Sequence, residues 1–399
     1  MRRPPLAPLI AAALSLGAIP ARAAAQAVPA RLTDSTFWRL MRDYSEPGGT
    51  FRSENLVSNE TSLQWIIPAL TRRIQPGGVY VGVAPDQNFT YIGALRPAIA
   101  FIVDIRHQNA MQHLMYKALV ETSATRAEFL ARLFARGPLE GVDTASSAAA
   151  LFAAVARNAP DSARYRETLQ AIVDRLVRVH GFALSEEEQR SLRCVYGAFF
   201  EQGPELTYAH GSECRNPGQL GFGVTYSVPG GVARGWRSMP TYEAMLTETD
   251  SAGVNWSYLG SEARYRALRE MHERNLIVPL TGNFAGTQAL RAVGRWAAAH
   301  GARVTTFYAS NVEQYLFMQG DEARRFYDNV ATLPIDSTSV FIRSFSGGRF
   351  VGVDTSLALR PQSAAGRSLQ LYSPIAETLR AVAEGRVMSW MDVIRLSRQ

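Results

Sequence analysis

Apolar and polar residues follow two different periods along this chain. Strand-length apolar runs occupy residues 77–84, 98–103, 276–280, 303–308 and 340–345. Helical periodicity occupies residues 36–44, 63–70, 107–121, 126–134, 287–300 and 374–384. Strands that alternate with helices of these lengths predict an α/β fold with a mostly parallel sheet and helices on both faces. We therefore expect a Rossmann-like, doubly wound core.

The strand pattern is interrupted in the middle of the chain. Between residues 137 and 275, alanine-rich helical patterns at 145–157, 162–180 and 186–200 lead into a glycine-rich stretch at 204–235. We expect the core in two parts, residues 26–136 and 276–399, with a mainly helical, loop-rich insertion at 137–275 between them.

The first 25 residues have the pattern of a secretory signal peptide. Arg2 and Arg3 precede an apolar run at 6–19, and small residues at 21–25 offer a cleavage site. The run is too short to cross a bilayer. We expect an exported protein, periplasmic or secreted, with no transmembrane segment in the mature chain.

Charge disfavours a nucleic-acid partner, and the partner that we expect from the polar strand ends is a small-molecule ligand. The chain carries a formal +7, and removal of residues 1–25 lowers it to +4, with no block of basic residues. Lys117 is the only lysine among many arginines. Ammonium has a tunable pKa, so Lys117 is a speculative acid/base residue, and chance on a helix surface is the alternative.

The two cysteines, Cys194 and Cys214, lie twenty residues apart. In an exported protein this favours a disulfide worth roughly 3 kcal/mol, with two free thiols as the alternative. A metal site needs more ligands, and only His210 is near, so no metal is predicted.

Polar residues gather where the predicted strands end. They are Asp86 with Asn88, then Asp104, then Asn283, then Asn311 with Glu313. Ligands bind beyond the carboxyl ends of strands in doubly wound sheets, so these loops predict one crevice. Residues 58–60, with Asn59 and Glu60, repeat the pattern of residues 310–313, and both are helix N-caps, ligand contacts or both.

The first strand turn narrows the class of ligand. It contains Gly82 and Asp86 and lacks the three-glycine fingerprint of a dinucleotide site. Asp86 would repel a pyrophosphate and attract a cationic ligand such as S-adenosylmethionine, whose ribose could use Asp104. A strand turn without any ligand is the alternative.

The blocks 79–92, with Gly82 and Asp86, and 101–106, with Asp104, resemble an uncharacterised bacterial protein family whose core is similar to class I S-adenosylmethionine-dependent methyltransferases. Blocks 283–286 and 310–316 also match. The resemblance covers about 50–135 and 270–345. It implies that Gly82, Asp86 and Asn88 belong to the cofactor loop and that Asp104 holds the ribose. Two departures are Ala84 in place of a second glycine and the lack of an Asn-Pro-Pro-Tyr-type motif.

Three functions follow as hypotheses. The first is a methyltransferase-like protein that binds an adenosyl ligand, with Asn59, Glu60, Asn283 and Asn311 toward the acceptor, and Glu313 or Lys117 as acid/base. Because that donor is made in the cytoplasm, the second is an exported binding or scaffold protein. The third is an exported hydrolase, although Gly-x-Ser-x-Gly, His-Glu-x-x-His and Walker motifs are absent.

Overall fold

A six-stranded mixed sheet forms the centre of the protein, and the computed structural model describes residues 27–51, 55–208, 214, 239–346 and 368–398. The strand order is β3-β2-β1-β4-β5-β6. The strands are β1 (Val79–Gly82), β2 (Ile99–Asp104), β3 (Ile277–Thr281), β4 (Val304–Ser310), β5 (Val340–Ser346) and β6 (Ser368–Pro374). The prediction of an α/β fold with a mostly parallel sheet is confirmed.

Strands β1 to β5 run parallel, and β6 runs antiparallel to β5. Every residue of β1 to β4 is buried, which explains why these strands appear as continuous apolar runs in the sequence. In β6 buried and half-buried residues are mixed, so its apolar signal is weaker. The sequence analysis did not identify β6.

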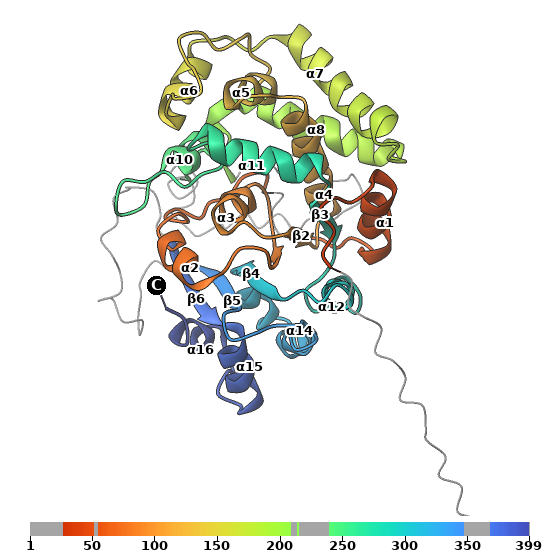
Figure 1. The fold of residues 1–399 in the computed structure, drawn as a ribbon, viewed down its shortest axis with the longest axis vertical. Helices are drawn as coiled ribbons and strands as arrows, with labels where there is room; N and C mark the ends of the chain where they lie inside the picture. The colour runs from red at the N-terminus through yellow and green to blue at the C-terminus, as the bar shows by residue number, and fades with distance from the viewer. Residues whose placement is uncertain (1–26, 52–54, 209–213, 215–238, 347–367, 399) are drawn as a thin grey trace, which may run out of the picture.

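Helices lie on the two sides of the sheet (Figure 1). One side carries α3 (Gln87–Leu95), α4 (His107–Glu121) and α11 (Glu262–Glu273). The other carries α12 (Ala289–Ala299), α14 (Glu322–Val330), α15 (Ile375–Ala383) and α16 (Trp390–Arg395). Further short or peripheral helices are α1 (Asp34–Tyr44), α2 (Ile67–Arg73) and α13 (Val312–Leu316).

The chain between β2 and β3 is long and helical. After α4 it forms α5 (Arg126–Leu133), α6 (Ala148–Ala156), α7 (Ser162–Asp174) with a π-helical end at Arg175–Val179, α8 (Glu186–Gln202) and α10 (Tyr242–Thr247), before α11. Local sequence sets several helix starts: Ser147, Asp161 and Ser185 are N-caps, and Ser185 forms a capping box with Glu188. The predicted signal peptide and most of the glycine-rich stretch lie outside the described residues.

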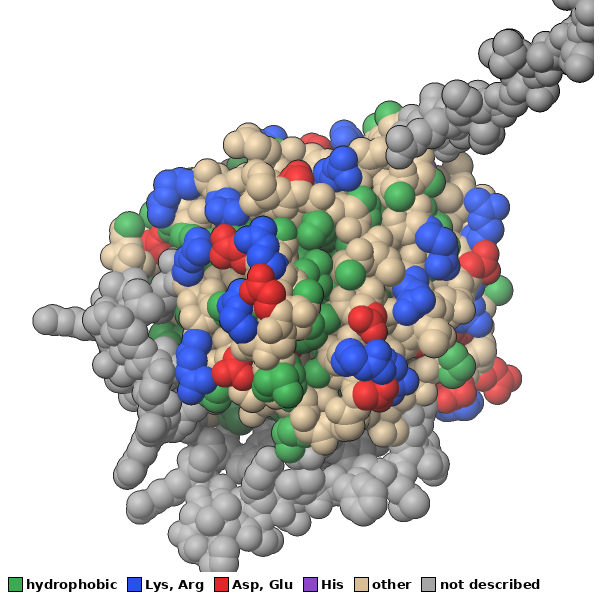
Figure 2. Space-filling model, turned by 90° about the horizontal axis from the view of Figure 1, so that it is seen from below, with side chains coloured by type: hydrophobic (Ala, Val, Ile, Leu, Met, Phe, Trp, Pro, Cys, Tyr) green, Lys and Arg blue, Asp and Glu red, His purple; other side chains and the backbone are tan. Residues whose placement is uncertain are grey.

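The surface in Figure 2 carries basic and acidic side chains intermixed, without a block of one sign. Exposed ion pairs of α14 agree with this picture: Arg324 lies 3.1 Å from both Asp321 and Asp328. Within the described part of the chain, no helix has both the length and the apolar character required to span a membrane.

Candidate functional site

A cavity of about 390 Å³ lies beyond the carboxyl ends of the parallel strands. We call it the strand-end pocket. It lies where the strand order reverses, because β1 continues to β2 on one side and β3 crosses to β4 on the other. Residues following β1 to β4, and Ser344 near the end of β5, line it together with the segment before α2. The lining includes Phe51, Asn55, Asn59, Glu60, Ala84, Gln87, Asp104, Arg106, Asn283, Ser310, Asn311, Tyr315 and Glu322.

The turn after β1 is held from inside the protein. The Asn88 side-chain amide donates to the carbonyls of Val83, Ala84 and Pro85 at 2.8, 3.0 and 2.7 Å. A Cβ on Gly82 would lie 2.0 Å from Asn88 Oδ1, so this glycine makes room for Asn88. Neither residue lines the pocket. Gly82 and Asn88 therefore shape the turn, and their predicted cofactor contacts gain no support from the pocket lining.

Two non-glycine residues of the pocket wall have left-handed backbones. Ala84 has φ of 69° and Ser310 has φ of 54°. Such conformations cost L-residues free energy, and they gather at functional sites. The alanine that departs from the methyltransferase glycine pattern thus adopts a glycine-like conformation, so the departure leaves the shape of the turn intact.

At the end of β2, Asp104 is clamped by Arg106. The Arg106 Nε and Nη2 donate to the two Asp104 carboxylate oxygens at 3.0 and 2.8 Å, and the Arg106 backbone N–H donates to Oδ1 at 2.9 Å. Arg106 Nη1 also donates to the Asn55 carbonyl at 3.1 Å. This bidentate pair fixes the predicted ribose acid at the pocket wall.

At the end of β4, Glu60 receives a set of hydroxyl donors. Tyr308 donates to Glu60 Oε2 at 2.8 Å, and Ser310 donates to Oε1. Burial raises the pKa of Glu60, while hydrogen bonds from Ser310 and Tyr308 oppose that rise. Glu60 is therefore a buried carboxyl at the pocket, and its ionised form is stabilised by neutral dipoles rather than by a cation.

The remaining predicted pocket residues lie at its rim. Asn283 Nδ2 donates to Glu322 at 3.4 Å, and Asn311 accepts from Ser310 at 3.4 Å. Asn59 contacts the sulfur of Met239 at 4.0 Å. Asn59, Glu60, Asp104, Asn283 and Asn311 are thus brought together by the fold, as expected for one crevice.

Asp86 faces the interior instead. It is not among the residues that line the strand-end pocket, and its Oδ2 accepts from Tyr258 at 3.0 Å. Burial raises the pKa of Asp86 to about 7, partly opposed by the Tyr258 hydrogen bond. Its predicted contact with a cationic ligand has no support in this geometry.

Glu313 is also directed away from the pocket. Its carboxylate pairs with Arg343, whose Nη2 lies 3.0 Å from Oε1, and accepts from Tyr327 at 2.7 Å. Both charged side chains are fully buried. Glu313 therefore joins α13 to β5, and its predicted acid/base role gains no support.

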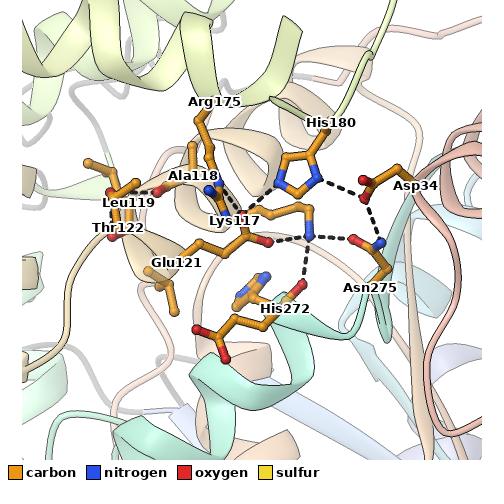
Figure 3. Close-up of polar contacts among 12 residues, drawn as sticks. Asp34, Lys117, Ala118, Leu119, Glu121, Thr122, Arg175, His180, His272 and Asn275 are labelled. Atoms are coloured by element: carbon orange, nitrogen blue, oxygen red, sulfur yellow. Dashed lines mark hydrogen bonds and ion pairs between the residues drawn. The ribbon is translucent and has the colours of Figure 1, made fainter. Parts of the chain in front are cut away.

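Lys117 lies in a buried polar network (Figure 3) and is not among the residues that line the strand-end pocket. Its ammonium donates to Glu121 Oε1, the His272 carbonyl and Asn275 Oδ1 at 2.5, 2.6 and 2.5 Å. All three donors are thus used. The alternative of a helix-surface lysine is wrong, because α4 is buried from Asn109 to Glu121.

The cysteines Cys194 and Cys214 form a disulfide, with Cα atoms 5.5 Å apart. The carbonyl of Cys214 accepts from Gln108 Nε2 of α4 at 2.7 Å. The disulfide thus joins Cys214 to α8, and the hydrogen bond joins it to α4, the helix that follows β2. Within the described residues, no group of His, Cys, Asp and Glu could hold a metal ion.

Three pocket residues or direct partners of pocket residues have no predicted role from the sequence: Arg106, Gln87 and Tyr308. Both Arg106 and Gln87 are close in sequence to predicted site residues. Arg106 lies two positions after Asp104, and Gln87 directly follows Asp86. The tyrosine within the apolar β4 run is the signal that could have indicated Tyr308, because a hydroxyl in a fully buried strand needs a hydrogen-bond partner.

The chain belongs to the protein family described as Domain of unknown function (DUF7790), whose model matches residues 55–194 and 233–384. These matches cover more than half of the chain and include all six strands of the sheet. A comparison with curated proteins finds no match.

Proposed function

We propose that the strand-end pocket binds an adenosyl ligand of the S-adenosylmethionine type, in a Rossmann-like core related to the methyltransferases. The order 3-2-1-4-5-6 is that of doubly wound nucleotide-binding sheets, with β6 as an antiparallel edge. The observation that carries the proposal is a cavity at the strand-order reversal with a carboxylate at the end of β2. About 390 Å³ is within the range of small-molecule sites.

Charge at the pocket favours a cationic or neutral ligand over a phosphate. Glu60, Asp104 and Glu322 line it, against the single guanidinium of Arg106 among its lining residues. That guanidinium is already paired with Asp104. Phosphate sites need free N–H donors or unpaired cations, so this lining disfavours a dinucleotide and a phosphoester substrate. A sulfonium meets no such penalty.

Asp104 keeps room for one more donor. Its Oδ1 accepts two N–H groups, whereas Oδ2 accepts one. A carboxylate offers about four acceptor positions, so Oδ2 can accept a ribose hydroxyl while the clamp with Arg106 stays closed. In this proposal Asp104 keeps its sequence-based role, and Arg106 orients it.

The roles of other residues change. Glu60 replaces Asp86 as the carboxyl toward the cationic end, because Glu60 lines the pocket and Asp86 does not. Asn283 and Asn311 are positioned to orient an acceptor at the rim. Glu313 and Lys117 are held in buried ion pairs, so the proposal is limited to ligand binding. Methyl transfer would require an acceptor that loses its proton without the help of these two residues.

The second candidate is an exported binding or scaffold protein that retains the fold without transfer chemistry. The engagement of Glu313 with Arg343, and of Lys117 with Glu121, favours it over a proton-transfer enzyme. Export from residues 1–25 stays a prediction. Cell fractionation of the native protein tests it, and a periplasmic location would separate the pocket from cytoplasmic S-adenosylmethionine.

Titration calorimetry of the mature chain tests the adenosyl proposal directly. We expect S-adenosylmethionine and S-adenosylhomocysteine to bind, and Glu60→Gln to weaken the sulfonium compound about tenfold more than the neutral thioether, because it removes a buried charge. Glu384→Gln is the matched control, since Glu384 is exposed and pairs only with Arg386. Absence of heat with both compounds, from a chain that melts cooperatively, would overturn the proposal. Turnover of an ester panel would favour the hydrolase instead.

A further inference from the structure

One residue that lines the strand-end pocket has a buried acceptor atom without a partner among the described residues. Gln87 begins α3, is only 4% exposed and lines the pocket. Its Nε2 donates to the Tyr308 hydroxyl at 3.1 Å, while its Oε1 has no hydrogen-bond partner within the described part of the chain. Buried polar atoms are almost always paired in native proteins, so an unpaired one at a cavity indicates a missing partner.

The direction of the Gln87 amide follows from its neighbours. The Tyr308 hydroxyl has one hydrogen, which it donates to Glu60. Tyr308 can then only accept from Gln87, so the Gln87 NH₂ must point to Tyr308 and its oxygen must point away. The hydrogen bond from Tyr308 to Glu60 thus leaves Gln87 Oε1 as the acceptor that has no partner in the described part of the chain.

We propose that Gln87 and Glu60 form a subsite for a protonated primary amine. An ammonium donates three hydrogen bonds and carries one positive charge. Gln87 Oε1 provides an acceptor, and Glu60, which accepts from neutral hydroxyl and amide groups rather than from a cation, provides the compensating charge. The guanidinium that lines the pocket, that of Arg106, is bound to Asp104. The inference rests on the proposed function only in using the same pocket, and it adds the class of ligand group bound there.

A water molecule is the competing partner for Gln87 Oε1. Gln87 also borders a void of about 10 Å³ shared with Asp86 and Thr90. That space is close to what one water needs. If a water in that void donates to Gln87 Oε1, Gln87 gives the pocket no preference for an amine. The following experiment distinguishes a water partner from an ammonium partner.

Ligand-observed NMR with the mature chain tests the subsite without any adenosyl compound. We expect n-butylammonium to bind in preference to n-butanol, and Gln87→Met to lower that preference about tenfold, the loss expected for one charge-assisted hydrogen bond. Gln170→Met is the matched control, because Gln170 lies on the exposed side of α7 and bonds only Asp174. Equal binding of amine and alcohol, or an unchanged preference in Gln87→Met, overturns the inference.

Tyr308→Phe is the second variant in case Gln87→Met does not fold. It keeps the ring against Tyr91 but removes the hydroxyl that orients Gln87, so we expect a severalfold loss of amine preference. An unchanged preference in this variant counts against the subsite.

Calorimetry with S-adenosylhomocysteine and 5′-methylthioadenosine separates this inference from the proposed function. The first compound carries an amine and the second lacks the amino-acid end. Tighter binding of the first supports both ideas. Equal binding of the two compounds overturns the amine subsite and keeps the adenosyl proposal. If neither compound binds while the preference for n-butylammonium persists, the adenosyl proposal is overturned and the subsite is kept.

Discussion

Two buried polar regions of this protein differ in how completely their groups are paired. Around Lys117, every ammonium hydrogen has an acceptor, and Glu121 also pairs with Arg175 at 2.8 Å and His180 at 2.7 Å. In the strand-end pocket, Gln87 Oε1 is unpaired and Ala84 has a left-handed backbone. The charged groups around Lys117 are paired, although both ring nitrogens of His272 have no partner in the described part of the chain. Paired buried charges stabilise a fold, whereas an unpaired and strained group at a cavity is available to a ligand.

The most unusual residue in the sequence belongs to the paired region and not to the pocket lining. Lys117 is unique in composition, yet it joins α4 to the loop at Asn275 and, through Glu121 and His180, to Asp34 at the start of α1 (Figure 3). A compact ammonium fits between three closely placed oxygens, and a planar guanidinium does not. This geometry gives a physical reason for lysine at this position.

The largest effect is expected from Lys117→Met. It leaves the buried Glu121 without its ammonium, and breaking a buried ion pair costs about 3–5 kcal/mol of unfolding free energy. Urea denaturation measures it. Arg178→Met is the control, because the Arg178–Asp174 pair is exposed and worth less than about 1 kcal/mol. A loss as small as that of the control would mean that the network does not stabilise the fold.

A second test uses acid. Burial alone would raise the pKa of Glu121, but hydrogen bonds from His180 and Lys117 lower it to about 2. A lowered folded pKa gives stability that is present above about pH 4.5 and is lost as pH falls toward 2, on the order of 3 kcal/mol. We expect the urea midpoint of Glu121→Gln to depend less on pH between pH 6 and 3 than that of the wild type. An equally steep loss in this variant would assign acid sensitivity to other carboxylates.

Asp86 has the opposite dependence. Because burial raises its pKa to about 7, the folded protein holds the proton more tightly, and stability falls as pH rises from about 4 through 7. Asp86→Asn keeps an acceptor for Tyr258 and removes the charge. We expect the free energy of unfolding of the variant to exceed that of the wild type by about 4 kcal/mol at pH 8 and to match it near pH 4. Thermal melts at both pH values measure this, and equal gains at both would contradict the raised pKa.

The smallest effect is expected from Ala84→Gly. Glycine removes the left-handed strain at φ 69° but loses more entropy on folding, so the change in unfolding free energy should stay within about 1 kcal/mol. Binding at the pocket should be unchanged. Ala84→Val, with a β-branched side chain in the same conformation, should lose clearly more stability, and equal melting of the two variants would show that the strain is absent in solution.

Much of the fold could be predicted from residue patterns. The apolar runs identified β1 to β5, each within two residues at its end, because strands buried on both faces are continuously apolar. The edge strand β6 was missed, since only part of it is buried. Of the predicted site residues, Asp104, Glu60, Asn59, Asn283 and Asn311 line the pocket, because strand ends and the segments beside them meet at one edge of a parallel sheet.

The sequence by itself determined the α/β class, the location of the polar strand ends and the family, because periodicity and short motifs are local properties. The tertiary structure alone decided which carboxyls face the cavity. Asp86 and Asp104 both follow buried strands, yet Tyr258, 172 residues from Asp86, holds it in the interior, while Arg106 holds Asp104 at the pocket wall. Glu313 was likewise taken up by Arg343 of β5. A side chain's direction depends on partners distant in the sequence, and no local pattern records them.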